Sequence, residues 1–416
     1  MRAFVLIASA LILAPAIAQA AETGMVRPEF LPPDTMILET LEASPQLAEA
    51  RAMLGAARAD QRILNAGDHE TQVTLAFDDR RVRREGSYSE YSFQAARGVR
   101  LPGKAAMDRA AGRAGLKAAE DGVDDARHQA SLTLVDRWIA WAEAAERRQL
   151  AEAELAVYAR EAAALARRVE LQDASLLDLE QARVAEARAR AAAAQAAGDE
   201  SAARAEVETM FPGLAPASAP VLSAPAAPAR AFEAWPDIIL ERSHEISIAR
   251  AVADRERFLA SRVRQDRLPD PSLGVRTFSE RNGEESGVGV FVSIPFSGPR
   301  RTAAADRQAA EASAAEARFT RIAREVRATA RGDVIAASSA LDAWRASNAA
   351  RTASEAAARR IARAYDLGER DLSDRLLAER QDFEARRSEL AARAEAHRRL
   401  LRLALDAHEL WLSEED

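Results

Sequence analysis

The chain is a tandem repeat of one unit. The segment SPQLAEARA at residues 44–52 returns 199 positions later as SHEISIARA at residues 243–251. A second match lies far downstream, where four residues return 196 positions later: Leu171, Leu176, Asp178 and Ala182 correspond to Leu367, Leu372, Asp374 and Ala378. Two matched blocks, in the same order and at nearly equal offsets, indicate two copies of one structural unit.

Both copies follow the same plan. We expect a signal segment over residues 1–20, a first repeat over 21–212, a Pro/Ala/Ser-rich linker over 213–229 and a second repeat over 230–416. Each repeat opens with a helical segment, expected at 38–65 and at 235–264. A β-hairpin then interrupts the helical pattern, at about 71–96 and 272–294. Two long helices close each repeat, expected at about 104–168 and 176–209, then 300–365 and 372–412.

Composition favours long, closely packed helices. Aromatic residues make up only 5% of the chain, while Ala, Leu and Arg are abundant, as in coiled coils. The absence of cysteine excludes a disulfide scaffold, a thiolate metal site, a cysteine nucleophile and a lipid-bearing N-terminal cysteine. A net charge of -7 argues against nucleic acid as a partner. The sequence shows no catalytic motif, and its five histidines show no ligand spacing. We therefore expect no enzyme, no cofactor and no metal site.

The first 20 residues are typical of a secretory signal. Arg2 supplies a positive start, residues 4–13 are apolar, and Ala18 and Ala20 form a small-x-small cleavage site. Export of a chain without cysteine suits the periplasm or the outer membrane of a Gram-negative cell.

The two hairpins constrain the assembly. Apolar residues alternate along them, as at Val73, Leu75 and Phe77, and each strand is about as long as the ~9–11 residues of a transmembrane strand. Four strands cannot close a membrane barrel, and an open edge in lipid leaves backbone groups unpaired. Two copies would give eight strands, and three would give twelve with room for a lumen. A conduit favours three. Two soluble hairpins on a helical bundle are the alternative.

The tips of the long helices carry a specific resemblance. The segment YDLGERDLSD at residues 365–374 resembles the second-repeat tip of the TolC-like outer-membrane factor family. The segment VELQDASLLD at 169–178 resembles its first-repeat partner, with Gln172 where the family often has glycine. Two strand-to-helix corners match as well, at Pro102 with Gly103 and at Pro295 with Gly298. The resemblance covers about residues 35–412.

This resemblance implies a mainly α fold with a small β part. Three chains would form one α-helical barrel in the periplasm, continuous with a 12-stranded transmembrane β-barrel to which each chain gives four strands. The homotrimer would be a passive duct in outer-membrane lipid. A periplasmic adaptor (membrane fusion protein) and an inner-membrane pump of the RND type would feed it. The compact length and the missing lipid-bearing cysteine resemble the heavy-metal cation branch, while drugs and other solutes remain open as cargo.

The resemblance also implies site residues at the tips. Asp374 would line the periplasmic entrance gate, with Asp178 and Asp371 as further candidates; ordinary first-turn acids favoured by the helix dipole are the alternative. The adaptor-docking surface would consist of Leu367, Gly368, Glu369, Arg370, Leu171, Gln172 and Asp173. The competing function is a soluble periplasmic coiled-coil scaffold or adaptor.

Overall fold

The computed structural model describes residue 25 and residues 27–296 and 298–411. The expected signal segment and Ser297 of the second corner lie outside the described residues. The first repeat consists of α1 (Asp34–Glu42), α2 (Pro45–Ala66), β1 (Thr71–Val82), β2 (Gly86–Gly98), α3 (Lys104–Glu170) and α4 (Leu176–Met210). The second consists of η1 (Phe232–Ala234), α5 (Trp235–Arg242), α6 (His244–Gln265), β3 (Ser272–Glu280), η2 (Arg281–Gly283), β4 (Glu285–Ser293), α7 (Pro299–Asp366) and α8 (Leu372–Asp406).

The first helical segment of each repeat is two helices, not the single helix expected. The break comes where the repeated motif begins, because its serine caps a new helix. The Ser44 hydroxyl accepts from the Leu47 amide at the start of α2, and the Ser243 hydroxyl accepts from the Ile246 amide at the start of α6. The last helix also differs from expectation: α8 ends at Asp406 and not at residue 412.

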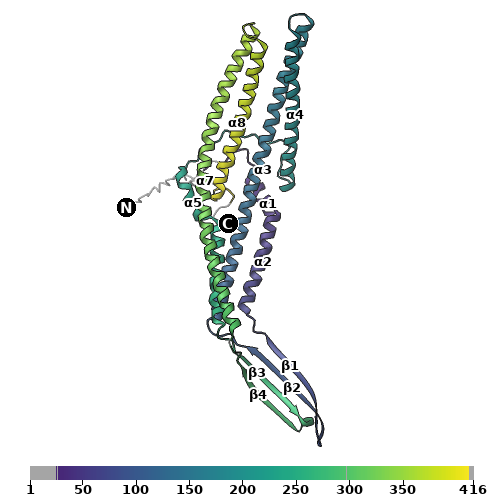
Figure 1. The fold of residues 1–416 in the computed structure, drawn as a ribbon, viewed down its shortest axis with the longest axis vertical. Coiled ribbons are helices and arrows are strands. Elements are labelled where there is room, and N and C mark those ends of the chain that lie inside the picture. The colour runs from purple at the N-terminus through teal and green to yellow at the C-terminus, as the bar shows by residue number, and fades with distance from the viewer. Residues whose placement is uncertain (1–24, 26, 297, 412–416) are drawn as a thin grey trace, which may run out of the picture.

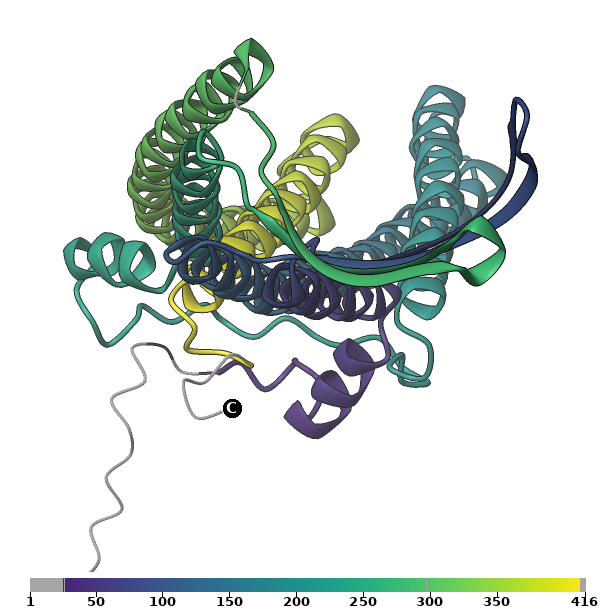
Figure 2. The same ribbon diagram turned by 90° about the horizontal axis from the view of Figure 1, so that it is seen from below.

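Each strand of the sheet is joined to one helix: β1 to α2, β2 to α3, β3 to α6, and β4 to α7 (Figure 1). The sheet is antiparallel with the order β1-β2-β3-β4. Above it, α2 packs on α3, α3 on α6, and α6 on α7, so the helix order repeats the strand order. Figure 2 shows the sheet bending into an arc when seen from below. Strands and helices therefore form one curved wall, and in the described residues the outer edges of β1 and β4 have no strand partner.

The two longest helices run through the whole wall. Helices α3 and α7 have 67 and 68 residues, which corresponds to about 100 Å each. Away from the sheet, α3 packs on α4 and on α8, and α7 packs on α8, so the far end is a pair of helical hairpins. None of the helices in the described part of the chain combines the length and the hydrophobicity that crossing a bilayer requires.

The run 213–229 is not a detached linker, contrary to its composition. Leu222 is 2% exposed and belongs to the main apolar core, which contains Trp141, Trp235 and Leu401. The Leu222 amide donates to Glu146 Oε1 on α3 at 2.7 Å, and its carbonyl accepts from Arg393 on α8. We name this run the belt. It ties the two repeats together at the middle of the wall.

Candidate functional site

One face of the sheet is apolar and largely exposed. The register aligns Val73, Ala95, Val275 and Val290 in one row across the four strands. The exposed large apolar side chains of this face are Val73, Leu75, Phe77, Tyr91, Phe93, Leu273, Val275, Val288, Val290 and Val292. The neighbouring row, on the other face, contains Thr74, Gln94, Arg276 and Gly289. The first face is thus the more apolar one, as on the lipid side of a strand wall. The second face carries this polar row together with Phe278 and Phe291, whose rings lie over Gly287 and Gly274.

The exposed area is too large and too regular for a soluble surface. Val290 is 85% exposed and Leu75 is 76% exposed, and no other described element covers either. Monomeric soluble proteins rarely leave such contiguous apolar patches in water, and they protect strand edges that could pair with another chain. The sheet has both an uncovered apolar face and two open edges.

A buried charge cluster fixes the corner between the sheet and α3. Lys104 is 1% exposed, and its Nζ atom lies 2.9 Å from both Asp266 Oδ1 and Asp270 Oδ1. Nζ also donates to the Leu268 carbonyl at 2.7 Å. Asp270 in turn accepts from the Leu101 amide at 2.9 Å. The cluster therefore joins the strand–helix junctions of the two repeats.

The sequence pattern missed this cluster because its members are about 160 positions apart. The corner residues that it did predict behave differently from each other. Gly103 caps α3 with φ +92°, a conformation that favours glycine. Gly298 caps α7 with φ −144°, an extended conformation open to any residue, so this corner does not require glycine. Pro102 lies in the turn before α3, and Pro295 lies in the irregular segment after β4.

The two tips have the same backbone turn. In the second repeat, the Gly368 amide donates to the Tyr365 carbonyl and the Glu369 amide donates to the Ala364 carbonyl, both at 2.9 Å. In the first, Gln172 takes the place of Gly368. These paired bonds are the Schellman termination, which needs a left-handed residue at the first position after the cap. Gly368 has φ +76° and Gln172 has φ +60°, so Gln172 adopts a conformation that costs a side chain energy.

Replacing Gln172 by glycine is expected to stabilise the first tip by about 1 kcal/mol, because glycine has no Cβ clash at this φ. Amide exchange of residues 169–176 should slow about fivefold. Gly368→Gln is the reciprocal variant and should speed exchange at the second tip. Equal exchange in wild type and Gln172→Gly would show that the turn carries no strain.

The predicted docking residues form an exposed surface at these tips. Leu171 is 70% exposed and Leu367 is 67% exposed, although both are large apolar residues. Gln172, Asp173, Gly368, Glu369 and Arg370 are exposed as well. The two tips thus present one leucine each beside polar side chains, which is a suitable surface for a partner protein.

The three predicted gate carboxylates have different local roles. Asp371 caps α8, where its Oδ1 atom accepts from Ser373 Oγ at 2.7 Å and from the Asp374 amide at 2.9 Å. These hydrogen bonds, that from Ser373 first, hold the pKa of Asp371 below its ordinary value. Asp374 and Asp178 occupy equivalent, half-buried positions in the first turns of α8 and α4. Asp374 Oδ2 lies 3.3 Å from Arg370 Nη1 of the same tip.

Tyr365, the first residue of the tip motif, and three residues that the sequence pattern did not single out connect the two hairpins near their tips. Arg375 on α8 lies 2.9 Å from Glu161 on α3, and its guanidinium lies 4.9 Å from the ring centre of Tyr365. Arg168 on α3 donates to the Tyr365 hydroxyl at 3.2 Å. The hairpins are therefore held side by side by these polar contacts, in which Glu161 is buried, and by a small apolar cluster that contains Leu165 and Leu372.

The likeness of this chain to known proteins lies in its structure. No protein-family model matches the chain. No curated protein matches it either. Among solved structures, the outer-membrane channel OprN superposes with a TM-score of 0.79 at 19% identity, over 91% of this chain and 90% of that chain. The chain has the fold of an outer-membrane channel protomer.

Two further channels share this fold. The open state of the MtrE outer-membrane channel of Neisseria gonorrhoeae has a TM-score of 0.74 at 18% identity, covering 91% of this chain and 89% of that chain. The CmeC outer-membrane channel of Campylobacter jejuni has a TM-score of 0.73 at 14% identity, covering 94% and 88%. The predicted TolC-like fold, mainly α with one four-stranded sheet, is confirmed.

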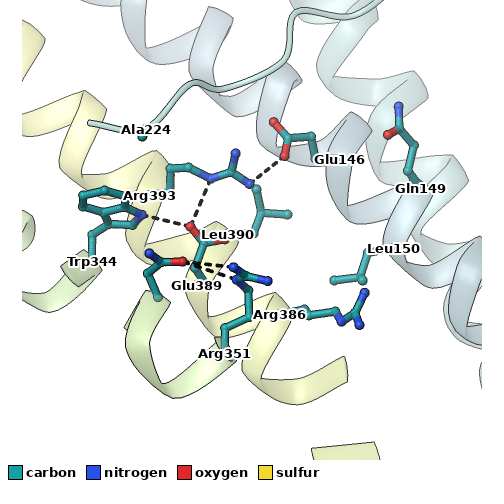
Figure 3. A pocket seen from close by; sticks show the side chains of 11 residues that line it. Glu146, Gln149, Leu150, Ala224, Trp344, Arg351, Arg386, Glu389, Leu390 and Arg393 are labelled. Atoms are coloured by element: carbon teal, nitrogen blue, oxygen red, sulfur yellow. Dashed lines mark hydrogen bonds and ion pairs between the residues drawn. The ribbon is translucent and has the colours of Figure 1, made fainter. Parts of the chain in front are cut away.

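In this channel fold, the belt borders an open, charged hollow of about 540 Å³ between α3, α7 and α8, where it contributes Ala224 (Figure 3). Glu389 accepts from Trp344 Nε1 at 2.9 Å and lies 3.3 Å from Arg393 Nε. Arg393 also lies 2.7 Å from Glu146. Arg393 and Glu146 pair with each other and also bind the backbone of Leu222, so the charges of this hollow hold the belt in place. Within the described ranges, no set of three or more His, Asp or Glu side chains is arranged to hold a metal ion.

Proposed function

We propose that the chain is the outer-membrane channel component of a tripartite efflux system. It acts as a passive trimeric duct in the outer membrane, with a long periplasmic extension. The exposed apolar sheet face carries this proposal, because lipid is the environment in which that face is stable. The likeness to outer-membrane channels over nine-tenths of the chain supports it.

Three copies account for the open edges. Side-by-side assembly pairs β4 of one copy with β1 of the next and closes twelve strands around a lumen. Because each strand is joined to one helix and the helices follow the strand order, the same threefold assembly also closes the helices into a barrel. The polar face of the sheet then lines the lumen, and the tips surround the periplasmic entrance.

The remaining roles in our proposal belong to residues of the two tips. Leu171 and Leu367, with the polar residues beside them, would dock a periplasmic adaptor that connects the duct to an inner-membrane pump of the RND type. Asp374 would form a threefold acidic ring at the entrance, with Asp178 next to it. Rings of carboxylates attract cations and repel anions. Heavy-metal cations are the cargo that we propose.

Replacing Asp374 by asparagine removes three charges from the proposed entrance ring. We expect the cation-over-anion permeability ratio of the purified duct in planar bilayers to fall about twofold or more. Asp342→Asn is the matched control, because Asp342 is an exposed acid on α7 away from the tip. An unchanged ratio in the Asp374 variant would remove Asp374 from the gate.

Fractionation tests the duct against a soluble scaffold or adaptor. A duct stays with the outer membrane until detergent is added, whereas a scaffold is released by osmotic shock. Release by osmotic shock alone would refute the proposal.

Growth of a deletion strain tests the cargo. The strain should become sensitive to divalent cations such as Zn²⁺, Co²⁺ or Cd²⁺, and the complementing gene should restore growth. Sensitivity to dyes, detergents and antibiotics instead would assign the duct to a multidrug pump.

A further inference from the structure

Three of the five histidines meet at one point, although no motif connects them. His128 lies on α3, His244 begins α6, and His408 lies in the turn after α8. The rings of His244 and His408 stack with their centres 4.5 Å apart and their planes at 21°. The His128 ring centre lies 6.2 Å from that of His244 and 6.0 Å from that of His408. Together they line a cavity of about 150 Å³.

The packing of this cluster suits neutral imidazoles. His128 is only 5% exposed, and its Nε2 atom lies 3.1 Å from Asp406 Oδ1. The Nδ1 atom of His128 and the Nε2 atom of His244 are buried without a hydrogen-bond partner. Protonation would place two or three positive charges at ring distances of 4.5–6.2 Å. Like charges at this distance repel, and burial weakens the screening by water.

Charged groups surround the cluster from every element that packs against it. They are Asp124, Asp125, Arg242, Glu245, Glu325, Asp333, Arg402, Asp406 and Glu409. Burial raises the pKa of Asp125, helped by Glu245, and burial raises the pKa of Asp333. These two carboxylates therefore lose their charge at a higher pH than usual. The negative charge that would balance protonated histidines fades as the pH falls.

The two stacked imidazoles resist protonation while they are packed. Burial lowers the pKa of His244, and burial together with His244 and His128 lowers the pKa of His408 to about 4. In a released state, both side chains would take up protons near the ordinary value of about 6.5. The released state thus binds more protons between about pH 6.5 and pH 4. For these two histidines, linkage then requires the packing to lose stability as the pH falls through that range.

We propose that the three histidines form an acid-sensitive latch, which holds the C-terminal turn (residues 407–411) against α3 and α6 at neutral pH and loosens it in acid. The turn follows the end of α8 at Asp406 with His408 at φ +54°, and its Ala407 and Leu410 side chains pack in the main apolar core. Its side-chain hydrogen bonds and ion pairs include Glu409 with Arg230 at 2.5 Å, the Ala407 carbonyl with Arg242 at 2.6 Å, and Trp411 with Asp34 at 2.9 Å.

These contacts define what the latch controls. Arg230 directly follows the belt, Arg242 ends α5, and Asp34 begins α1. The turn therefore fastens the short outer segments to the long helices at the middle of the wall. Loosening the turn frees the belt, α5 and α1 from these contacts, while the sheet and the tips keep theirs. The latch is thus a property of the middle of the wall and is independent of the proposed cargo.

Amide hydrogen exchange of the full-length, detergent-purified protein tests the latch. Protection of residues 404–411, corrected for the intrinsic pH dependence of exchange, should fall about tenfold or more between pH 7.5 and pH 5.0. Residues in the middle of α3 should show no such change. The variant His244→Gln/His408→Asn should lose this pH dependence, since asparagine tolerates the left-handed backbone at position 408. His69→Gln is the control, because His69 pairs with Asp270 at the sheet corner.

Two results would overturn the latch. One is equal protection of residues 404–411 at both pH values in the wild-type protein. The other is the same loss of protection in the double variant as in the wild type. Should the double variant fail to fold, His408→Asn alone must reduce the pH-dependent change, and an undiminished change in that variant would equally refute the latch.

Discussion

Replacing Val290 by arginine is expected to prevent assembly in the outer membrane. Val290 is 85% exposed on the apolar face, in the middle of the edge strand β4, where it lies opposite Val275. An arginine on the lipid face near the bilayer midplane costs about 2–4 kcal/mol, and a trimer would carry three. We expect the yield of detergent-extracted trimer to fall more than tenfold, measured by quantitative blotting of outer-membrane fractions.

A variant on the opposite face separates charge from position. Gln94 lies in the central strand β2, in the polar row that contains Arg276. Gln94→Arg should assemble close to the wild-type level, because this face is proposed to face water in the lumen. Normal assembly of Val290→Arg would mean that the apolar face does not contact lipid.

Replacing Lys104 by methionine is expected to have the largest effect on stability outside the sheet. The substitution keeps an unbranched side chain and removes the buried charge that pairs with both Asp266 and Asp270. Losing one partner of a buried, hydrogen-bonded charge pair costs about 3–5 kcal/mol. Unfolding in denaturant, followed by helix circular dichroism, should shift to a clearly lower midpoint.

The chain offers a closely matched control for this variant. Lys117 lies on the same helix and also pairs with an aspartate, Asp121, at 2.6 Å, but its side chain is 60% exposed. Lys117→Met should cost clearly less than Lys104→Met, because the Lys117 side chain is exposed and the buried Asp121 keeps its hydrogen bond from Ser247 Oγ at 2.6 Å. If both methionine variants unfold at the same denaturant concentration, the corner cluster does not stabilise the fold.

The repeat explains how much of this fold follows from the sequence. The motif pairs 44–52 with 243–251, and both serines cap helices, so the two copies fold alike. Alternation of apolar residues predicts the hairpins, because each strand places most of its apolar side chains on one and the same face of the sheet. The tip motif predicts the same turn in both repeats, even though Gln172 replaces glycine.

Contacts between distant segments could not be predicted in the same way. Lys104 meets Asp270, and His128 meets His244 and His408, only because the wall brings the two repeats side by side. The docking of the belt could not be predicted for a related reason. Its composition is typical of a linker, yet a single apolar residue, Leu222, and its backbone groups suffice to dock it.

Electron cryo-microscopy of the assembly, extracted from the outer membrane in detergent, tests the central claim most directly. The account predicts three copies around one axis, with twelve strands closed by β1–β4 pairing between neighbours. It also predicts that the apolar row through Val290 faces the detergent. A monomer, or an assembly in which another layer covers that apolar face, would contradict the proposed duct.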